Sequence, residues 1–160
     1  MDKGRQPMSR PPMTDAKRIA AEWACERLIR RFALLNDAGE YEELASLFVE
    51  DGSFARPTDP DNPVVGRQAI LGFFRSRPKR TTRHLMSNIV VDVEDDGGTA
   101  RAVSYVTLYS GPAGSGTPPI AADPVQLVGA YHDKLVLTDA GWRFAERRGS
   151  VALKTRQAQE

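Results

Sequence analysis

The sequence contains a single cysteine, Cys25, so no disulfide can form within the chain and no cysteine-rich metal site is possible. It has only two histidines, His84 and His132, and no recognised metal-ligand spacing. A phosphate-binding glycine motif is also absent from the sequence. We therefore expect neither a metal nor another cofactor. Cys25 lies in a helical pattern with nothing nearby to lower its pKa, which predicts a small packing residue rather than a nucleophile.

A strong net charge and long apolar runs are missing as well. The formal net charge is +1, and no apolar run approaches the roughly 18 residues of a membrane span. These absences predict a cytoplasmic protein without nucleic-acid or membrane partners. The densest basic stretch, residues 75–83, lacks the interleaved aromatic residues of a nucleic-acid-binding face. We interpret it as a solvated turn or as a rim that attracts an anionic ligand.

The length of 160 residues suits one domain. Residues 1–13 are polar, rich in proline and without periodicity, and they contain no apolar segment of a secretory signal. We expect them to form a disordered tail, with Met13 an equally good start of the chain. The domain is predicted over residues 14–152, followed by a C-terminal tail over 153–160.

Helical periodicity dominates the first part of the domain. Apolar residues spaced by three and four predict a long helix from Thr14 or Asp15 to about Asp37, which Gly39 ends. Further helices are expected over 41–48 and 67–77. Between them we expect a turn at 50–52, a short strand over 53–56 and an exposed proline-rich loop over 57–63.

The second part of the chain is rich in β-branched residues. Strands are expected over 82–94, 99–109, 125–137 and 142–151, with turns at 95–98 and 139–141 and a long Gly- and Pro-rich connection over 111–124. Helices followed by an antiparallel meander predict an α+β fold.

Several local phrases occur in an order typical of one family. They are Asn36-Asp37-Ala38-Gly39-Glu40-Tyr41, Leu47 to Gly52, Val65 to Ile70, Gly129 to Asp133 and Gly141 to Arg148. Their order resembles the NTF2-like superfamily, in particular its SnoaL-like branch, with scytalone dehydratase, polyketide cyclases and ring-hydroxylating dioxygenase β subunits as relatives. The resemblance implies a cone-shaped fold, with N-terminal helices packed on a strongly curved, mostly antiparallel sheet. It also implies a homo-oligomer, either a dimer or a trimer.

The resemblance further implies a catalytic pair. In several enzymes of the branch, an Asp of the first helix and a His of the following strand act together as acid and base, and Asp37 and His84 match those positions. This implies a lyase or isomerase that dehydrates, cyclises or isomerises a hydrophobic cyclic carbonyl compound. The sequence departs from scytalone dehydratase at the pocket tyrosines: Asn36 precedes Asp37, and the short strand carries Phe54 and Arg56.

Alternation along the strands determines which other side chains could join the pair. If His84 faces the pocket, Met86 and Asn88 share its face, and otherwise His84 is a surface residue. Tyr131 lies opposite in phase to His132, and the resemblance favours Tyr131 as the inward residue. The candidate substrate-binding residues are Asn36, Phe54, Arg56, Met86, Asn88, Tyr105 and Tyr131. Asp133 is expected to pair with an arginine of the last strand, such as Arg147.

A second hypothesis belongs to another class of function. The same fold serves as a non-catalytic binding or assembly subunit, for example the β subunit of ring-hydroxylating dioxygenases. That hypothesis predicts a filled or disordered cavity and stable association with a larger iron-bearing chain. The enzyme hypothesis predicts a hydrophobic small-molecule ligand instead.

Overall fold

The computed structural model describes residues 13–114 and 117–155. Helices α1 (Asp15–Ala38) and α2 (Tyr41–Ser46) come first, followed by strands β1 (Phe48–Ala55) and β2 (Val64–Val65) and helix α3 (Arg67–Ser76). Four long strands complete the chain: β3 (Arg80–Val93), β4 (Thr99–Pro112), β5 (Leu127–Thr138) and β6 (Gly141–Lys154). This order confirms the predicted α+β class.

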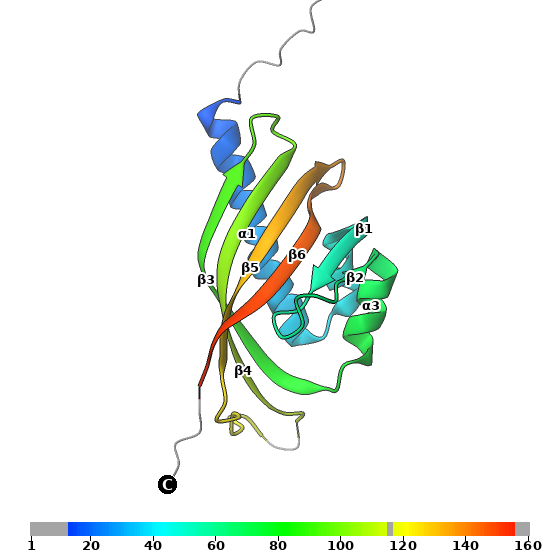
Figure 1. Cartoon of the computed structure of the whole chain (residues 1–160), viewed down its shortest axis with the longest axis vertical. Helices are drawn as coiled ribbons and strands as arrows, with labels where there is room; N and C mark the ends of the chain where they lie inside the picture. Colours follow the sequence, from blue (N-terminus) through cyan, green and yellow to red (C-terminus); the bar gives the residue numbers. More distant parts are fainter. Residues whose placement is uncertain (1–12, 115–116, 156–160) are drawn as a thin grey trace, which may run out of the picture.

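The strands form one curved sheet in the order β2-β1-β6-β5-β4-β3 (Figure 1). Strand β1 runs parallel to β6, and all other neighbours are antiparallel. Helix α1 crosses one face of the four long strands, while α3 packs beside β1 and β2 (Figure 1). The sheet therefore has one face covered by α1 and one face without a helix.

Helix α1 begins and ends where the sequence predicts. The Thr14 side chain accepts a hydrogen bond from the Lys17 backbone N–H, and Gly39 adopts a left-handed conformation with φ of 76°. The buried stripe of the helix consists of Cys25, Leu28, Ile29, Phe32, Ala33 and Asn36. Burial raises the pKa of the Cys25 thiol to about 12, which confirms this cysteine as a protonated packing residue.

Phe32 lies at the centre of the core. Its ring is within 6.3 Å, between ring centres, of five aromatic rings from β1, α3, β5 and β6: Phe48, Phe54, Phe74, Tyr131 and Phe144. Edge-to-face contacts of this kind add to the free energy of burying the rings. This cluster joins α1 to the strands of both halves of the sheet.

The region after α2 differs from the prediction. Helix α2 ends at Ser46, and Phe48 begins β1 instead of ending the helix. The expected turn at 50–52 is an irregularity within β1, where the register with β6 shifts between Phe48 and Ser53. A Cβ atom on Gly52 would lie 3.1 Å from the Phe144 carbonyl oxygen, so glycine lets the two backbones approach closely here.

A bulge in β3 changes which residues face α1. Ser87 pairs with Tyr105 and Val90 with Val103, so β3 has one residue more than β4 in this interval. Asn88 has φ of 48° at this point. The expected alternation fails beyond it, because Val90 is 59% exposed whereas Val91 is buried.

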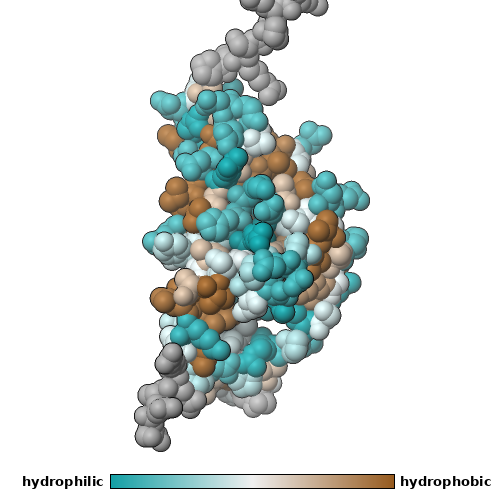
Figure 2. Space-filling view, viewed as in Figure 1, coloured by the Kyte–Doolittle hydropathy of each residue, from teal (hydrophilic) through white to brown (hydrophobic). Residues whose placement is uncertain are grey.

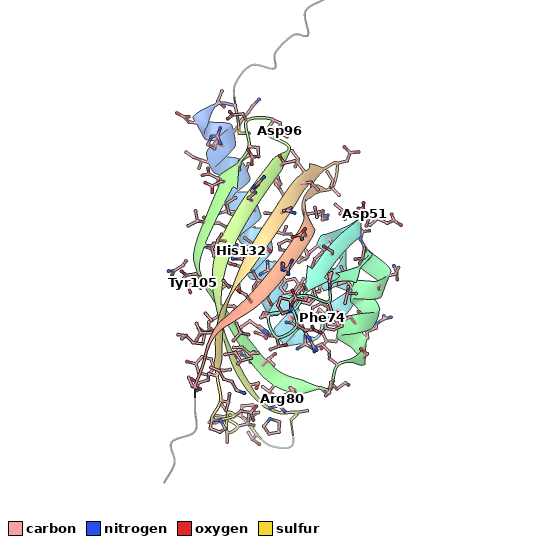
Figure 3. The ribbon with its side chains drawn as sticks, in the orientation of Figure 1. Asp51, Phe74, Arg80, Asp96, Tyr105 and His132 are labelled. Carbon is pink, nitrogen blue, oxygen red and sulfur yellow. The ribbon has the colours of Figure 1, made fainter. Side chains whose placement is uncertain are left out.

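The face of the sheet opposite α1 carries large apolar side chains among polar ones (Figure 2). Leu85, Val90, Val103 and Tyr105 are exposed on β3 and β4. Figure 3 shows Tyr105 and His132 on this same face. His132 is exposed and its neighbour Tyr131 is buried, which confirms that Tyr131 points inward.

The ends of the domain extend slightly beyond the predicted limits. Met13 packs against the core, and β6 continues to Lys154. The rest of the predicted tails, residues 1–12 and 156–160, lies outside the described residues. Among the described residues, no helix is long and apolar enough to cross a membrane.

Candidate active site

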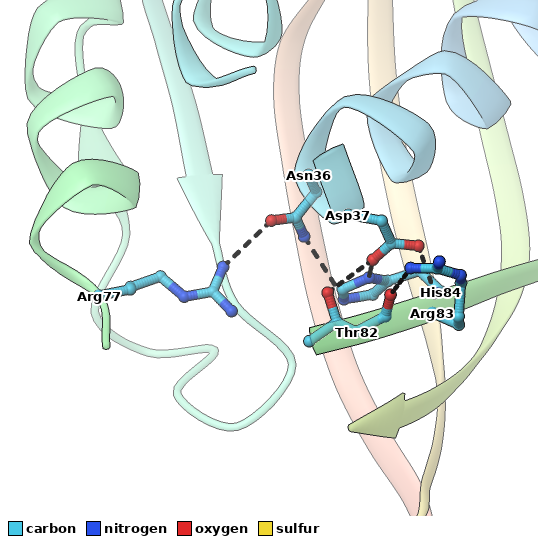
Figure 4. A network of polar contacts seen from close by, with 6 residues as sticks. All are labelled: Asn36, Asp37, Arg77, Thr82, Arg83 and His84. Carbon is cyan, nitrogen blue, oxygen red and sulfur yellow. Dashed lines mark hydrogen bonds and ion pairs between the residues drawn. The ribbon is translucent and has the colours of Figure 1, made fainter. Parts of the chain in front are cut away.

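The side chains of Asp37 and His84 meet at the C-terminal end of α1 (Figure 4). Asp37 Oδ1 lies 2.5 Å from His84 Nδ1, and Oδ2 accepts a 2.8 Å hydrogen bond from the His84 backbone N–H. Thr82 Oγ1 donates a further hydrogen bond of 2.8 Å to Oδ1. The two side chains are only 10% and 9% exposed. The carboxylate is thus held at three points and fixes the orientation of the imidazole ring.

Local structure explains how these groups come together. Gly39 ends α1 directly after its last turn, so Asn36 and Asp37 project from the end of the helix toward β3. On β3, Thr82 and His84 are two residues apart and therefore share a face of the strand. A carboxylate in the last turn of a helix faces the negative end of the helix dipole, which is unfavourable. Its three hydrogen bonds offset that cost.

Arg77 and Asn36 determine where the imidazole carries its proton. Arg77 Nη1 donates to Asn36 Oδ1 at 3.4 Å, and Asn36 Nδ2 lies 3.4 Å from His84 Nε2 (Figure 4). A guanidinium group only donates, so the amide oxygen must face Arg77 and the amide nitrogen must face the imidazole. His84 Nε2 then accepts a hydrogen bond. The proton of the neutral ring is on Nδ1, facing Asp37.

The carboxyl group of Asp37 stays ionised at neutral pH. Burial alone would raise its pKa, but the hydrogen bonds from the His84 side chain, the His84 backbone and Thr82 together lower it below the ordinary value of 3.8. An ionised Asp37 accepts the Nδ1 proton and stabilises a positive charge on the ring. The pair can therefore remove and return a proton through Nε2.

A cavity of about 130 Å³ lies next to His84 and Asn36. Its wall is mainly apolar and comes from α3, from β1 and the loop after it, and from β4 to β6: Phe54, Pro57, Thr58, Phe73, Val106, Leu108, Leu127, Gly129 and Val151. A wider groove of about 640 Å³ adjoins it and shares Pro57, Thr58, Leu108, Leu127 and Val151. A ligand at His84 can thus extend outward along the ends of the strands.

The loop after β1 closes this cavity against β6. A Cβ atom on Gly149 would lie 2.5 Å from Pro57 Cγ, so only glycine lets the proline pack onto the strand at this position. Pro57 and Thr58 thereby form one wall of the cavity.

The predicted site residues separate into two groups. Asn36, Phe54, Arg56, His84 and Tyr131 line the cavity, and Asp37 lies behind the imidazole. The other three do not line it. Met86 packs against the core, Asn88 is exposed at the bulge of β3, and Tyr105 is 50% exposed on the opposite face of the sheet (Figure 3).

The sequence analysis did not name Thr58, Phe73, Arg77 or Thr82 as site residues. Thr82 could have been found, because it lies two residues before His84 on the same face of a predicted strand. Phe73 and Arg77 also line the cavity. They come from the end of α3, and no local pattern indicates that this end faces His84.

Tyr131 links the cavity to a second buried pair beneath it. Burial raises the pKa of its phenol, so the hydroxyl is protonated and can donate a hydrogen bond. Arg147 packs on the Tyr131 ring at 4.0 Å and forms an ion pair of 2.8 Å with Asp133. This confirms the predicted pairing. Burial raises the pKa of Asp133 to about 6, against the opposing effect of Arg147.

The fold and the buried Asp–His pair beside a small apolar cavity define a pocket protein of the NTF2-like class. The chain belongs to the family of the SnoaL-like domain, whose profile matches residues 17–148. Both findings confirm the resemblance seen in the sequence. No curated protein matches this chain.

Several solved structures share the fold of this chain. A candidate scytalone dehydratase from Novosphingobium aromaticivorans is 26% identical, with a TM-score of 0.74 over 92% of this chain and 94% of that one. An NTF2-like protein with a cystatin-like fold from the same species is 27% identical, with a TM-score of 0.65 over 83% and 82%. A type 2 hexachlorocyclohexane dehydrochlorinase is 16% identical, with a TM-score of 0.74 over 91% and 94%, which shows the fold alone. These neighbours fit a small-molecule pocket enzyme.

Proposed function

We propose that this protein is a cofactor-independent lyase or isomerase that removes a proton next to the carbonyl group of a hydrophobic cyclic compound. The observation that carries the proposal is the 2.5 Å contact between Asp37 Oδ1 and His84 Nδ1, beside a cavity that His84 itself lines. Asp37 does not line the cavity, and its oxygens accept hydrogen bonds from Thr82 and His84. This arrangement favours His84 Nε2, rather than Asp37, as the base.

The proton transfers follow from the geometry. A substrate displaces the long Asn36 contact, and the lone pair on His84 Nε2 takes a proton from the carbon next to the carbonyl. The imidazole then carries a positive charge, which the ionised Asp37 stabilises. Tyr131 donates a hydrogen bond to the carbonyl oxygen as negative charge develops there. The imidazolium finally returns the proton to another carbon, or gives it to a leaving hydroxyl group.

Exchange of hydrogen for deuterium tests this chemistry without knowledge of the natural substrate. The purified protein is incubated in D₂O with 1-tetralone or 4-chromanone, and loss of the signal of the protons next to the carbonyl is followed by ¹H NMR. We expect exchange above the rate in buffer, and a decrease of at least about 100-fold in His84→Ala. The control is Thr81→Ala, on the same strand but outside the cavity lining. Exchange at the buffer rate, or equal exchange in His84→Ala, would sink the proposal.

Proton removal by a fixed base separates this proposal from the second hypothesis, a non-catalytic binding or assembly subunit. The dehydratase-like neighbours and the aligned acid–base pair support the enzyme. Self-association and the cellular compartment stay predictions. The apolar side chains on the uncovered face of the sheet support a homo-oligomer.

A further inference from the structure

The cavity beside His84 contains positive charge with no negative partner in its wall. The ionisable side chains that line it are Arg56, Arg77, His84 and Tyr131, and no acidic side chain of the described residues joins them. Arg56 lies 3.4 Å from Asp59 in the loop after β1. Arg77 forms no ion pair within the part of the chain that the structure describes. Its guanidinium group contacts the Asn36 amide oxygen at 3.4 Å and lies over the Phe74 ring at 5.4 Å.

Neighbouring arginines behave differently. Arg75, two residues earlier, forms an ion pair with Glu42, and Arg80, three residues later, forms one with Asp123. The partner of Arg75 is an exposed carboxylate and that of Arg80 lines the adjoining groove, whereas Arg77 itself lines the cavity. A guanidinium group has five N–H donors, and within the described residues the one long bond to Asn36 uses one of them. Arg77 therefore has donors free for a ligand.

We propose that the cavity binds hydrophobic ring compounds that carry a carboxylate, and that Arg77 selects for that group. The guanidinium donors form two parallel hydrogen bonds with a carboxylate, which an amide or a hydroxyl cannot accept in the same way. The ring of the ligand then lies against Phe54 and Phe73, which line the same cavity. Arg56, already near Asp59, adds positive charge at the rim.

The position of Arg77 also determines which part of the ligand reacts. Asn36 contacts both Arg77 and His84 Nε2, so a carboxylate on Arg77 places the adjoining ring beside Nε2. The remainder extends into the groove of about 640 Å³. The substrate class is accordingly a cyclic keto acid. This identification of the substrate rests on the proposed function, whereas the preference for carboxylates requires only that the cavity is the ligand site.

The test compares two probes of equal shape and different charge, 2-naphthoate and 2-naphthamide. Each is titrated into ¹⁵N-labelled protein at pH 7 and moderate ionic strength, and the Kd is taken from chemical-shift changes at residues around the cavity. We expect 2-naphthoate to bind at least about tenfold more tightly than 2-naphthamide to the wild-type protein. In Arg77→Gln this preference is lost, and in Arg77→Lys part of it remains.

Arg75→Gln is the matched control, because it removes the same charge from the same helix outside the cavity. It should keep the full preference for 2-naphthoate. Equal binding of the two probes to the wild-type protein would overturn the proposal, as would the absence of binding at millimolar 2-naphthoate. A preference that survives in Arg77→Gln with unchanged backbone shifts would overturn it as well.

The two proposals can fail separately. His84→Ala should still prefer 2-naphthoate to 2-naphthamide, even where the Kd of both probes changes, because the charge that selects the carboxylate is on Arg77. Binding that depends on Arg77, in a protein that catalyses no deuterium exchange, would leave the anion site intact and refute the enzyme. Deuterium exchange in a protein that does not prefer 2-naphthoate to 2-naphthamide would support the enzyme and refute the carboxylate site.

Discussion

The protein contains two buried acid–base pairs whose surroundings differ. Asp37 and His84 are 2.5 Å apart at the end of α1, and the imidazole lines a cavity. Asp133 and Arg147 are 2.8 Å apart with no exposed surface, and the guanidinium group lies over the rings of Phe32, Tyr131 and Phe144. The Asp37–His84 pair, here called the cavity pair, can reach a ligand. The Asp133–Arg147 pair, here called the core pair, is enclosed by packed side chains.

The difference shows that burial of charge does not by itself indicate catalysis. Within the described residues, the core pair leaves Asp133 Oδ1 and two nitrogens of Arg147 without a hydrogen-bond partner, and the Arg147 guanidinium group lies over three aromatic rings. The cavity pair has its carboxylate satisfied by three hydrogen bonds and its Nε2 in contact with a displaceable amide. Only the Asp37–His84 pair, whose imidazole lines the cavity, can exchange a proton with a ligand.

The largest loss of stability is expected from breaking the core pair. In Arg147→Met the free energy of unfolding should fall by about 3–5 kcal/mol, because Asp133 is left buried without its partner. Urea unfolding at pH 7, followed by circular dichroism, measures the change. The double variant Arg147→Met, Asp133→Leu should regain most of the loss. A fall of less than about 1 kcal/mol in the free energy of unfolding of Arg147→Met would show that the pair is not enclosed as described.

A smaller loss is expected at the cavity pair. Asp37→Asn should lower the free energy of unfolding by about 1–3 kcal/mol, because a charged acceptor of three hydrogen bonds is replaced by a neutral one. Deuterium exchange should also fall, because the amide no longer stabilises the imidazolium.

The difference in free energy of unfolding between wild type and Asp37→Asn should change with pH in a defined direction. The pKa of Asp37 is below its ordinary value of 3.8 in the folded protein, so its stabilisation is present above pH 3.8 and disappears as the pH falls toward the folded pKa. The part of the stability difference between wild type and Asp37→Asn that comes from this carboxylate should therefore be lost as the pH falls below about 4. A difference that stays undiminished at about pH 2 would contradict the hydrogen bonds assigned to this carboxylate.

The smallest effect is expected from Tyr105, which the sequence placed in the pocket. Tyr105→Ser should change the exchange rate less than about twofold and the free energy of unfolding by no more than about 0.5 kcal/mol, because the side chain is half exposed on the uncovered face. The exchange assay and urea unfolding measure both quantities. A large loss of exchange would mean that the uncovered face contributes to the site.

Local sequence patterns determined the elements and much of the site. The spacing of apolar residues, with a capping Thr14 and a terminating Gly39, was sufficient to place α1 correctly. Asn36, Asp37, His84 and Tyr131 could be selected because a family resemblance was combined with alternation along strands. The pairing of Asp133 with an arginine of the last strand, such as Arg147, was expected from the sequence and is confirmed.

Tertiary structure decided the rest, because register and direction depend on contacts between segments far apart in the chain. The extra residue of β3 near Asn88 reverses the faces beyond it, and nothing in the strand composition indicates where a bulge falls. Arg77 looks like its neighbours Arg75 and Arg80 in the sequence. Only the packing of α3 beside β1 turns it toward His84, whereas the other two meet carboxylates at the surface. The sequence thus determined the fold and selected the two residues, Asp37 and His84, that meet beside the cavity, while long-range packing decided which charged side chains line that cavity.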